Sequence, residues 1–255
     1  MGDVDAESAI APDGTGRFRT RLSSAWGISG TPNGGYAALA LLRAMAAVAE
    51  RPDPVSATIH YLRPAAGNAD AELTVDVVRR GRATVVVQGR MVQDAKERLV
   101  ASAVFADLTE PAGTGPELTV AAPAIPPPDF CTPRAELAQG VELSLLARVD
   151  VRVHLEPEAV GGWVRFVDGT PPDPLTLVLL TDVFPPSALA IVGPTGWVPT
   201  IELTVHVRRR PAPGWIQARF ETDDLHDGRM IESGCLWDET GALVARSRQL
   251  GLVRI

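Results

Sequence analysis

The chain has 255 residues, of which 45% are apolar and 22% charged, so it can bury a sizeable core as one large domain or two small ones. Its formal net charge of -7 argues against a nucleic-acid partner, because contact with phosphates favours a basic surface. Lys96 is the sole lysine, which leaves Schiff-base chemistry and a phosphate-binding P-loop almost without a candidate.

The cysteines, the N-terminus and the length of the apolar run predict the cellular compartment of the protein. Cys131 and Cys235 have no His or Cys neighbours at metal-ligand spacing, which predicts no metal site and a reducing environment. The acidic N-terminus lacks the basic and apolar stretches of a signal peptide, and the apolar run 36–49 is too short to cross about 30 Å of hydrocarbon. We therefore expect a cytoplasmic protein without a membrane partner.

The first half of the chain predicts one helix followed by strands. Turn-forming residues between Gly27 and Gly35 precede residues 36–51, which are strong helix formers without Gly or Pro and end at Pro52. This helix is apolar nearly all round, so other elements should enclose it. Residues 17–26 are expected to be extended, and strands are predicted at 56–62, 72–79, 84–92 and 99–105.

A change of composition separates the two halves. Residues 108–133 are rich in Pro, Gly, Ala and Thr, which is typical of a linker. We therefore expect an N-terminal tail at 1–16, a first domain at 17–107, a linker at 108–140 and a second domain at 141–255. In the second half, strands are predicted at 148–155, 162–167, 200–211, 215–222, 230–237 and 243–253, with a second apolar helix from 175 to about 192, interrupted near Pro185-Pro186.

The order of the second half repeats that of the first. Thr58 and His60 match Thr204 and His206, and a Gly-Arg turn follows each pair at nearly the same distance. This indicates an internal duplication in which each copy is a long helix followed by a four-stranded antiparallel sheet, an α+β fold whose sheets should pair.

Asp182 is the only charged residue between Leu175 and Pro186. Burying a carboxylate is costly unless hydrogen-bond donors converge on it, so Asp182 is either an acid tuned for chemistry or a cap on a helix turn broken at Pro185-Pro186.

The sequence resembles the acyl-CoA thioesterase family, whose fold is a double hotdog. The resemblance covers about residues 17–255 and is carried by several motifs in order: Trp26, Pro32-Asn33-Gly34-Gly35-Tyr36, Tyr61-Leu62-Arg63-Pro64, Asp182 before Pro185-Pro186, Pro199-Thr200-Ile201-Glu202, and Leu243-Val244-Ala245-Arg246-Ser247-Arg248-Gln249. In the family, an aspartate, a threonine or serine and a glutamine hold the water that hydrolyses the thioester. The resemblance therefore implies that Asp182, Thr200 and Gln249 are catalytic, although Thr204 lies on the same face of a regular strand as Thr200.

The substrate side is expected at Gly34, Gly35 and Tyr36. Unpaired N–H groups at a helix N-terminus favour negative charge, and glycine allows close approach, so this helix start is the candidate for holding the oxyanion. Tyr36 stands where the family usually has glutamine. In the first copy the position matching Gln249 is Phe105 and the helix has no acid, so we expect one chemical site in each chain.

The resemblance implies an acyl-CoA thioesterase of fatty acid metabolism that uses neither a metal nor an organic cofactor. The alternative is an acyl-thioester-binding protein of the same fold without turnover. The sequence leaves open the acyl length, whether the carrier is coenzyme A or a protein-borne pantetheine, and whether the chain forms a homo-oligomer.

Overall fold

The computed structural model describes residues 2–110, 113, 115–137, 140–194 and 196–253. Its elements up to residue 110 are α1 (Asp3–Glu7), β1 (Ala11–Pro12), β2 (Arg17–Leu22), β3 (Gly27–Ile28), β4 (Thr31–Pro32), α2 (Gly34–Ala49), β5 (Asp53–Tyr61), β6 (Ala69–Arg80), β7 (Val85–Gln93) and β8 (Lys96–Ala106). The later elements are β9 (Thr132–Pro133), β10 (Val149–Leu155), β11 (Ala159–Phe166), α3 (Pro174–Leu180), α4 (Leu189–Val192), β12 (Thr200–Val207), β13 (Ile216–His226), β14 (Arg229–Asp238) and β15 (Leu243–Leu252). The architecture is therefore α+β, with long antiparallel strands and few helices.

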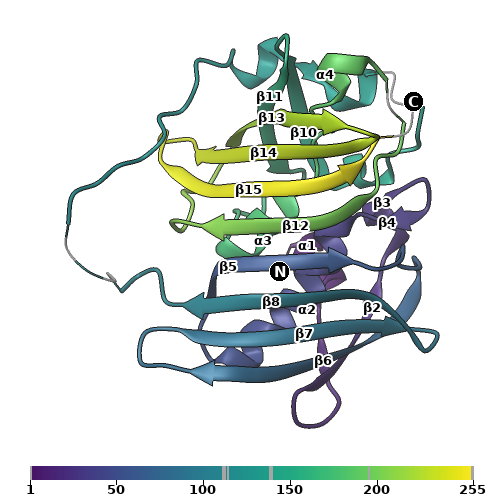
Figure 1. The fold of residues 1–255 in the computed structure, drawn as a ribbon, viewed down its shortest axis with the longest axis vertical. Coiled ribbons are helices and arrows are strands. Elements are labelled where there is room, and N and C mark those ends of the chain that lie inside the picture. The colour runs from purple at the N-terminus through teal and green to yellow at the C-terminus, as the bar shows by residue number, and fades with distance from the viewer. Residues whose placement is uncertain (1, 111–112, 114, 138–139, 195, 254–255) are drawn as a thin grey trace.

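Apart from the short β3–β4 ribbon, the described strands form one antiparallel sheet. Their order is β1-β2-β6-β7-β8-β5-β12-β15-β14-β13-β11-β10-β9. The two halves of the chain meet where β5 pairs with β12, in the middle of the view in Figure 1. The two predicted sheets therefore join edge to edge and share one continuous hydrogen-bonded ladder.

The sheet is arranged symmetrically about this β5–β12 seam. Outward from it, the order is β5-β8-β7-β6-β2 on one side and β12-β15-β14-β13-β11 on the other. Thr58 lies opposite Thr204 at the seam. Each seam strand carries a bulge at the matching place, between Pro54 and Ser56 in β5 and between Thr200 and Glu202 in β12. This matching order and register support the inferred duplication.

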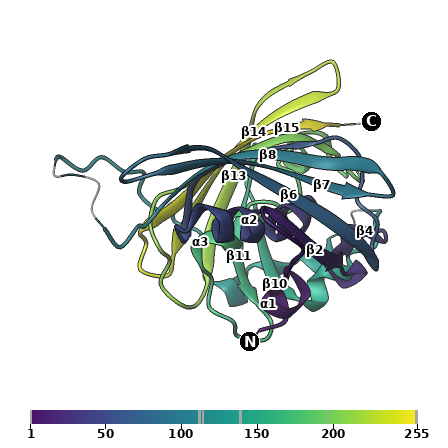
Figure 2. The same cartoon turned by 90° about the horizontal axis from the view of Figure 1, so that it is seen from below.

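Helix α2 lies beneath the first half of the sheet (Figure 2). Asn33 caps it by accepting a hydrogen bond from the Tyr36 N–H at 3.0 Å. Its alanine and leucine side chains pack against β6 and β7, and Leu39, Leu41 and Leu42 are fully buried. The prediction of an enclosed apolar helix is confirmed, because the helix is covered on nearly every side.

The second helix is much shorter than predicted. α3 has 7 residues against 16 in α2, and the chain forms a separate short helix, α4, only from Leu189. Asp173 and Thr176 make a capping box at the start of α3. Further along, Pro185 and Pro186 lack the N–H groups that a continuing helix would need. The prediction of a second long helix is therefore wrong, and Asp182 lies in the irregular segment after α3.

The segments predicted as tail and linker both contact the domains. Val4 of α1 is buried, and Glu7 forms two hydrogen bonds with Arg148 at 2.8 Å. Along the linker, Trp237 and Trp163 donate to the carbonyls of residues 120 and 126 at 2.8 and 2.7 Å. Residue 1 of the predicted tail, residues 111–112, 114 and 138–139 of the predicted linker, and residues 195 and 254–255 of the predicted second domain lie outside the described residues.

Candidate active site

A cavity of about 450 Å³ lies between the two halves of the molecule. Its lining includes the start of α2, the end of β5, the segment after α3, and parts of β12, β14 and β15. The polar side chains that contact the cavity, together with one glycine, include Asn33, Gly34, Tyr61, Arg134, Asp182, Thr200, Glu232 and Gln249. The structure thus brings Asp182, Thr200 and Gln249 together in one cavity of the size that holds a small ligand.

One oxygen of the Asp182 carboxyl is held by donors from the first half of the chain. Its Oδ2 accepts hydrogen bonds from the Gly35 N–H at 2.8 Å and from Asn33 Nδ2 at 2.9 Å. Asn33 Nδ2 also donates to the Asp182 carbonyl oxygen at 2.8 Å. The other oxygen, Oδ1, has no hydrogen-bond partner among the described residues, so it can accept a proton from a molecule in the cavity.

The surroundings of Asp182 set its proton affinity. Burial raises the pKa of its carboxyl, and the hydrogen bonds from Gly35 and Asn33 and the charge of Arg134 lower it. Burial has the larger effect, and the resulting pKa is about 6. The group is therefore mostly ionised at pH 7 but is a stronger base than an exposed aspartate. A general base works best when its pKa lies near the operating pH.

The two glycines at the start of α2 allow this close approach. A Cβ on Gly34 would stand 3.0 Å from Cε1 of Tyr61 and 3.1 Å from Asp182 Oδ2. A Cβ on Gly35 would stand 2.9 Å from the Asp182 Cβ and 3.0 Å from the Leu179 backbone, which cannot move cheaply. Glycine is required here because the helix start packs directly on the segment that carries the aspartate.

Gln249 and Thr200 lie on neighbouring strands and touch each other. Gln249 Nε2 donates to Thr200 Oγ1 at 2.8 Å, and both residues line the cavity. Thr204, the alternative threonine on the same strand, lies at the β5–β12 seam. Its hydroxyl oxygen is 2.9 Å from the Thr58 hydroxyl oxygen, and the Thr204 hydroxyl donates to Glu202 Oε1 at 2.5 Å. It is not among the residues that line the cavity, so the geometry favours Thr200.

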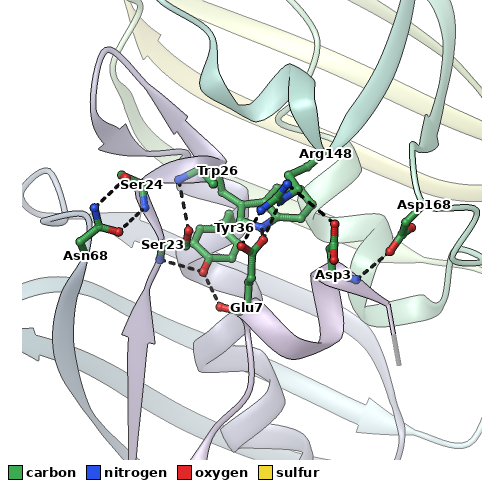
Figure 3. A network of polar contacts seen from close by, with 10 residues as sticks. Asp3, Glu7, Ser23, Ser24, Trp26, Tyr36, Asn68, Arg148 and Asp168 are labelled. Atoms are coloured by element: carbon green, nitrogen blue, oxygen red, sulfur yellow. Dashed lines mark hydrogen bonds and ion pairs between the residues drawn. The ribbon is translucent and has the colours of Figure 1, made fainter.

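Tyr36 points away from the cavity, contrary to the expectation that it binds substrate. Its ring stacks on Trp26 with centroids 5.3 Å apart, and its hydroxyl accepts from the Ser23 N–H at 3.0 Å and donates to the Glu7 carbonyl (Figure 3). Burial raises the pKa of this phenol to about 12. Tyr36 therefore supports the fold, because the first helical turn directs it toward α1.

The expectation for Gly35 also changes. Its N–H donates to Asp182, so it is occupied by the aspartate and is not open to an oxyanion. Gly34 lines the cavity at the first position of α2, where helical N–H groups lack intrahelical acceptors.

In the first half, the position equivalent to Gln249 differs from the one expected. Gln249 lies opposite Leu203 on β12, and the symmetric pair is Ala57 and Ala103. Ala103 is therefore the equivalent residue, and the expected Phe105 is opposite Pro54, at the bulge. Neither residue is polar, so the described first half has no counterpart of Gln249.

Two sequence models match the chain in tandem. The acyl-CoA thioesterase N-terminal domain matches residues 22–106, and the acyl-CoA thioesterase C-terminal domain matches residues 116–253. The chain belongs to the acyl-CoA thioesterase family. The predicted resemblance is confirmed, and its two domains fall on the two halves of the sheet.

Solved structures share the fold of this thioesterase-family chain over its whole length. A Thermobifida fusca protein, provisionally assigned as a thioesterase II, is 31% identical with a TM-score of 0.88, covering 100% of this chain and 98% of its own. A hotdog-fold protein of unknown function from Alicyclobacillus acidocaldarius is 22% identical with a TM-score of 0.89, covering 100% and 99%. The acyl-CoA thioesterase II TesB2 from Mycobacterium marinum is 20% identical with a TM-score of 0.76, covering 98% of both chains. The hotdog fold is therefore confirmed.

The curated relatives match a smaller part of the chain. Uncharacterised proteins from Mycobacterium tuberculosis and Mycobacterium bovis are 33% identical over 97 residues, which is 38% of this chain. The match spans about a third of the length of these relatives. Within the described residues, no helix is long and apolar enough to span a membrane, and no cluster of three or more His, Cys, Asp or Glu could hold a metal ion.

Several cavity residues of the thioesterase-family chain were not found from the sequence. Asn33 belongs to the motif Pro32-Asn33-Gly34-Gly35-Tyr36, but its contact with Asp182 joins residues 149 positions apart. Arg134, which is 3% exposed, donates to the Val183 carbonyl, and burial lowers its pKa to about 10. Glu232 is 6% exposed. As an acid within a largely apolar strand, it could have been found by the reasoning applied to Asp182.

Tyr61 places an unusual hydroxyl beside Asp182. Among the described residues, its hydroxyl oxygen and Arg98 Nε are the only side-chain polar atoms that are fully enclosed by protein, and so do not face the cavity, and that have no hydrogen-bond partner. Burial and the negative charges of Asp182 and Glu202 raise the pKa of Tyr61 well above 10. The phenol therefore stays neutral and remains a hydrogen-bond donor.

Proposed function

We propose that this chain is an acyl-CoA thioesterase in which Asp182, Gln249 and Thr200 position a water for direct attack on the thioester carbonyl. The observation that carries the proposal is the state of the Asp182 carboxyl. One of its oxygens is fixed by Gly35 and Asn33, and the other has no partner among the described residues in the cavity that holds the Gln249–Thr200 pair.

The proposed step requires a base and two further contacts to water. The water oxygen attacks the carbonyl carbon while Asp182 accepts one of its protons; the carbon–sulfur bond then breaks, and the proton passes to the departing thiolate. The Gln249 amide and the Thr200 hydroxyl can each donate to or accept from the water. General-base assistance of this kind contributes about 10²- to 10⁴-fold to the rate.

The oxyanion of the tetrahedral intermediate needs donors at the opposite side of the carbonyl. We assign it to the Gly34 end of the cavity, where the first N–H of α2 and the positive end of the helix dipole favour negative charge. This assignment narrows the expected oxyanion site from the helix start at Gly34, Gly35 and Tyr36 to Gly34, because the Gly35 N–H donates to Asp182 and the Tyr36 N–H donates to Asn33.

Release of free thiol from purified protein tests the proposal. Acyl-CoA esters of increasing length should each release coenzyme A with saturable kinetics, and parallel acyl-carrier-protein thioesters should show which carrier is used. The alternative function is acyl-thioester binding without turnover. Saturable binding of acyl-CoA with no thiol release would support that alternative and refute the enzyme.

A further inference from the structure

We infer that the acyl group bound in this cavity carries a hydrogen-bond donor, a hydroxyl or an amine, near its thioester carbonyl, and that Glu232 binds this donor. The inference rests on the proposed function and names the substrate class of the same site. It starts from a buried acid that the proposed hydrolysis does not use.

Glu232 lies next to the proposed water-binding pair. It stands on β14 directly opposite Gln249 on β15, and both residues line the cavity. Residues that face each other across antiparallel strands have Cβ atoms about 5 Å apart. A group that reaches Glu232 from a carbonyl beside Gln249 therefore belongs to the first few carbons of the acyl chain.

The Glu232 carboxyl is held so that one of its oxygens remains open. Its Oε2 accepts hydrogen bonds from the Ser187 N–H and the Ser187 hydroxyl, both at 2.6 Å. The Ser187 and Thr222 hydroxyl oxygens are 2.8 Å apart, which further fixes the serine. Oε1 has no hydrogen-bond partner among the described residues, so this part of the site is rigid but incomplete.

A purely structural role would not require a charge here. The apolar side chains of Phe184 and Phe220 line the same cavity. Burial, assisted by the negative charges of Asp182 and Asp223, raises the pKa of Glu232 to about 7, although the hydrogen bonds from Ser187 lower it. A neutral acceptor could bind Ser187 equally well at a lower desolvation cost. A donor on the substrate would instead satisfy Oε1 and stabilise the ionised form.

The same arrangement disfavours one class of acyl group. Asp182 and Glu232 both line the cavity, so an acyl chain that ends in a carboxylate would meet like charge. An unsubstituted short chain would leave Oε1 desolvated and unpaired. Sites built to hydrogen-bond a substrate hydroxyl discriminate strongly against the analogue that lacks it.

Matched four-carbon thioesters test the inference. The kcat/KM values of butyryl-CoA, 3-hydroxybutyryl-CoA, 4-hydroxybutyryl-CoA, 3-aminobutyryl-CoA and succinyl-CoA are measured for the native chain, for Glu232→Gln and for the exposed control Glu239→Gln. In Glu232→Gln, the amide oxygen can keep both Ser187 bonds and turn the NH₂ group toward the cavity. Comparison of the hydroxy esters with the amino ester shows which hydrogen-bond donor is preferred.

We expect at least one hydroxy or amino ester to exceed butyryl-CoA by about tenfold or more, with succinyl-CoA poorest. Glu232→Gln should reduce that ratio at least about tenfold for the amino ester, because an ammonium group cannot accept from the NH₂ group, and less for a hydroxy ester, whose oxygen can accept from it. Glu239→Gln should retain both ratios. Two results would overturn the inference while leaving the proposed function intact. One is hydrolysis of butyryl-CoA as fast as that of the hydroxy and amino esters. The other is a ratio of kcat/KM values that is unchanged in Glu232→Gln. If no ester is hydrolysed, the proposed function fails, and calorimetric binding of the same esters then decides the preference.

Discussion

Replacing Asp182 by asparagine should abolish most turnover while making the protein more stable. The amide oxygen of the introduced asparagine can accept from the Gly35 N–H and from Asn33 Nδ2 as the carboxylate Oδ2 does, so the local geometry is kept. The NH₂ group then takes the place of Oδ1 and donates where the native group accepts. The variant thus removes the base without removing the contacts between α2 and the segment after α3.

The size of both effects follows from the Asp182 environment. Loss of general-base assistance costs about 10²- to 10⁴-fold in turnover. The folded pKa of about 6 lies above the ordinary value of 3.8, so the unfolded chain ionises first and the folded state loses stability as the pH rises from about 4 to 6. At 1.36 kcal/mol per pKa unit, this loss amounts to about 3 kcal/mol above pH 6.

The assay compares native protein and Asp182→Asn by thiol release and by thermal unfolding at pH 7.5 and pH 4. We expect lower kcat and, at pH 7.5, a Tm raised by about 6–12 °C, with the two proteins converging at pH 4 where both are neutral at this position. A lower Tm for the variant at pH 7.5 would refute the reasoning, because it would make the carboxylate a stabilising cap.

Three further outcomes test other parts of the site. The native kcat/KM should fall as the pH drops through about 6, where Asp182 becomes protonated, and a flat profile from pH 5 to 8 would contradict its role as base. Thr200→Val should lower kcat at least about tenfold, whereas Thr204→Val should mainly reduce the unfolding free energy by about 1 kcal/mol, and the reverse pattern would favour Thr204. Gly35→Ala should lose both activity and about 1–3 kcal/mol of stability, as measured by urea unfolding, because its Cβ would overlap Asp182 and Leu179. A stable, active Gly35→Ala protein would contradict the close packing.

The sequence was sufficient for the strands and for the duplication because both depend on local patterns that occur twice. It was insufficient for the length of the second helix: an interruption was predicted near Pro185-Pro186, but α3 already stops at Leu180 and the chain is irregular until α4 begins at Leu189. The edge-to-edge joining of β5 and β12 also depends on contacts between distant residues, which a local pattern does not encode.

For the candidate site, the three residues that the family motifs indicate, Asp182, Thr200 and Gln249, line one cavity, and their catalytic roles stay a prediction. They could not show that Tyr36 turns toward Trp26, because the direction of a side chain on an enclosed helix depends on what packs around it. The Asn33 contact with Asp182 likewise forms only when the two halves meet.

A single turnover in ¹⁸O-labelled water tests the central claim, direct attack by a water that Asp182 activates. With enzyme in excess over acyl-CoA, we expect the released carboxylic acid to carry one ¹⁸O atom and the peptide that contains Asp182 to remain unlabelled by mass spectrometry. An unlabelled acid together with ¹⁸O in the Asp182 carboxyl would show that the aspartate itself attacks the thioester, and would contradict the account.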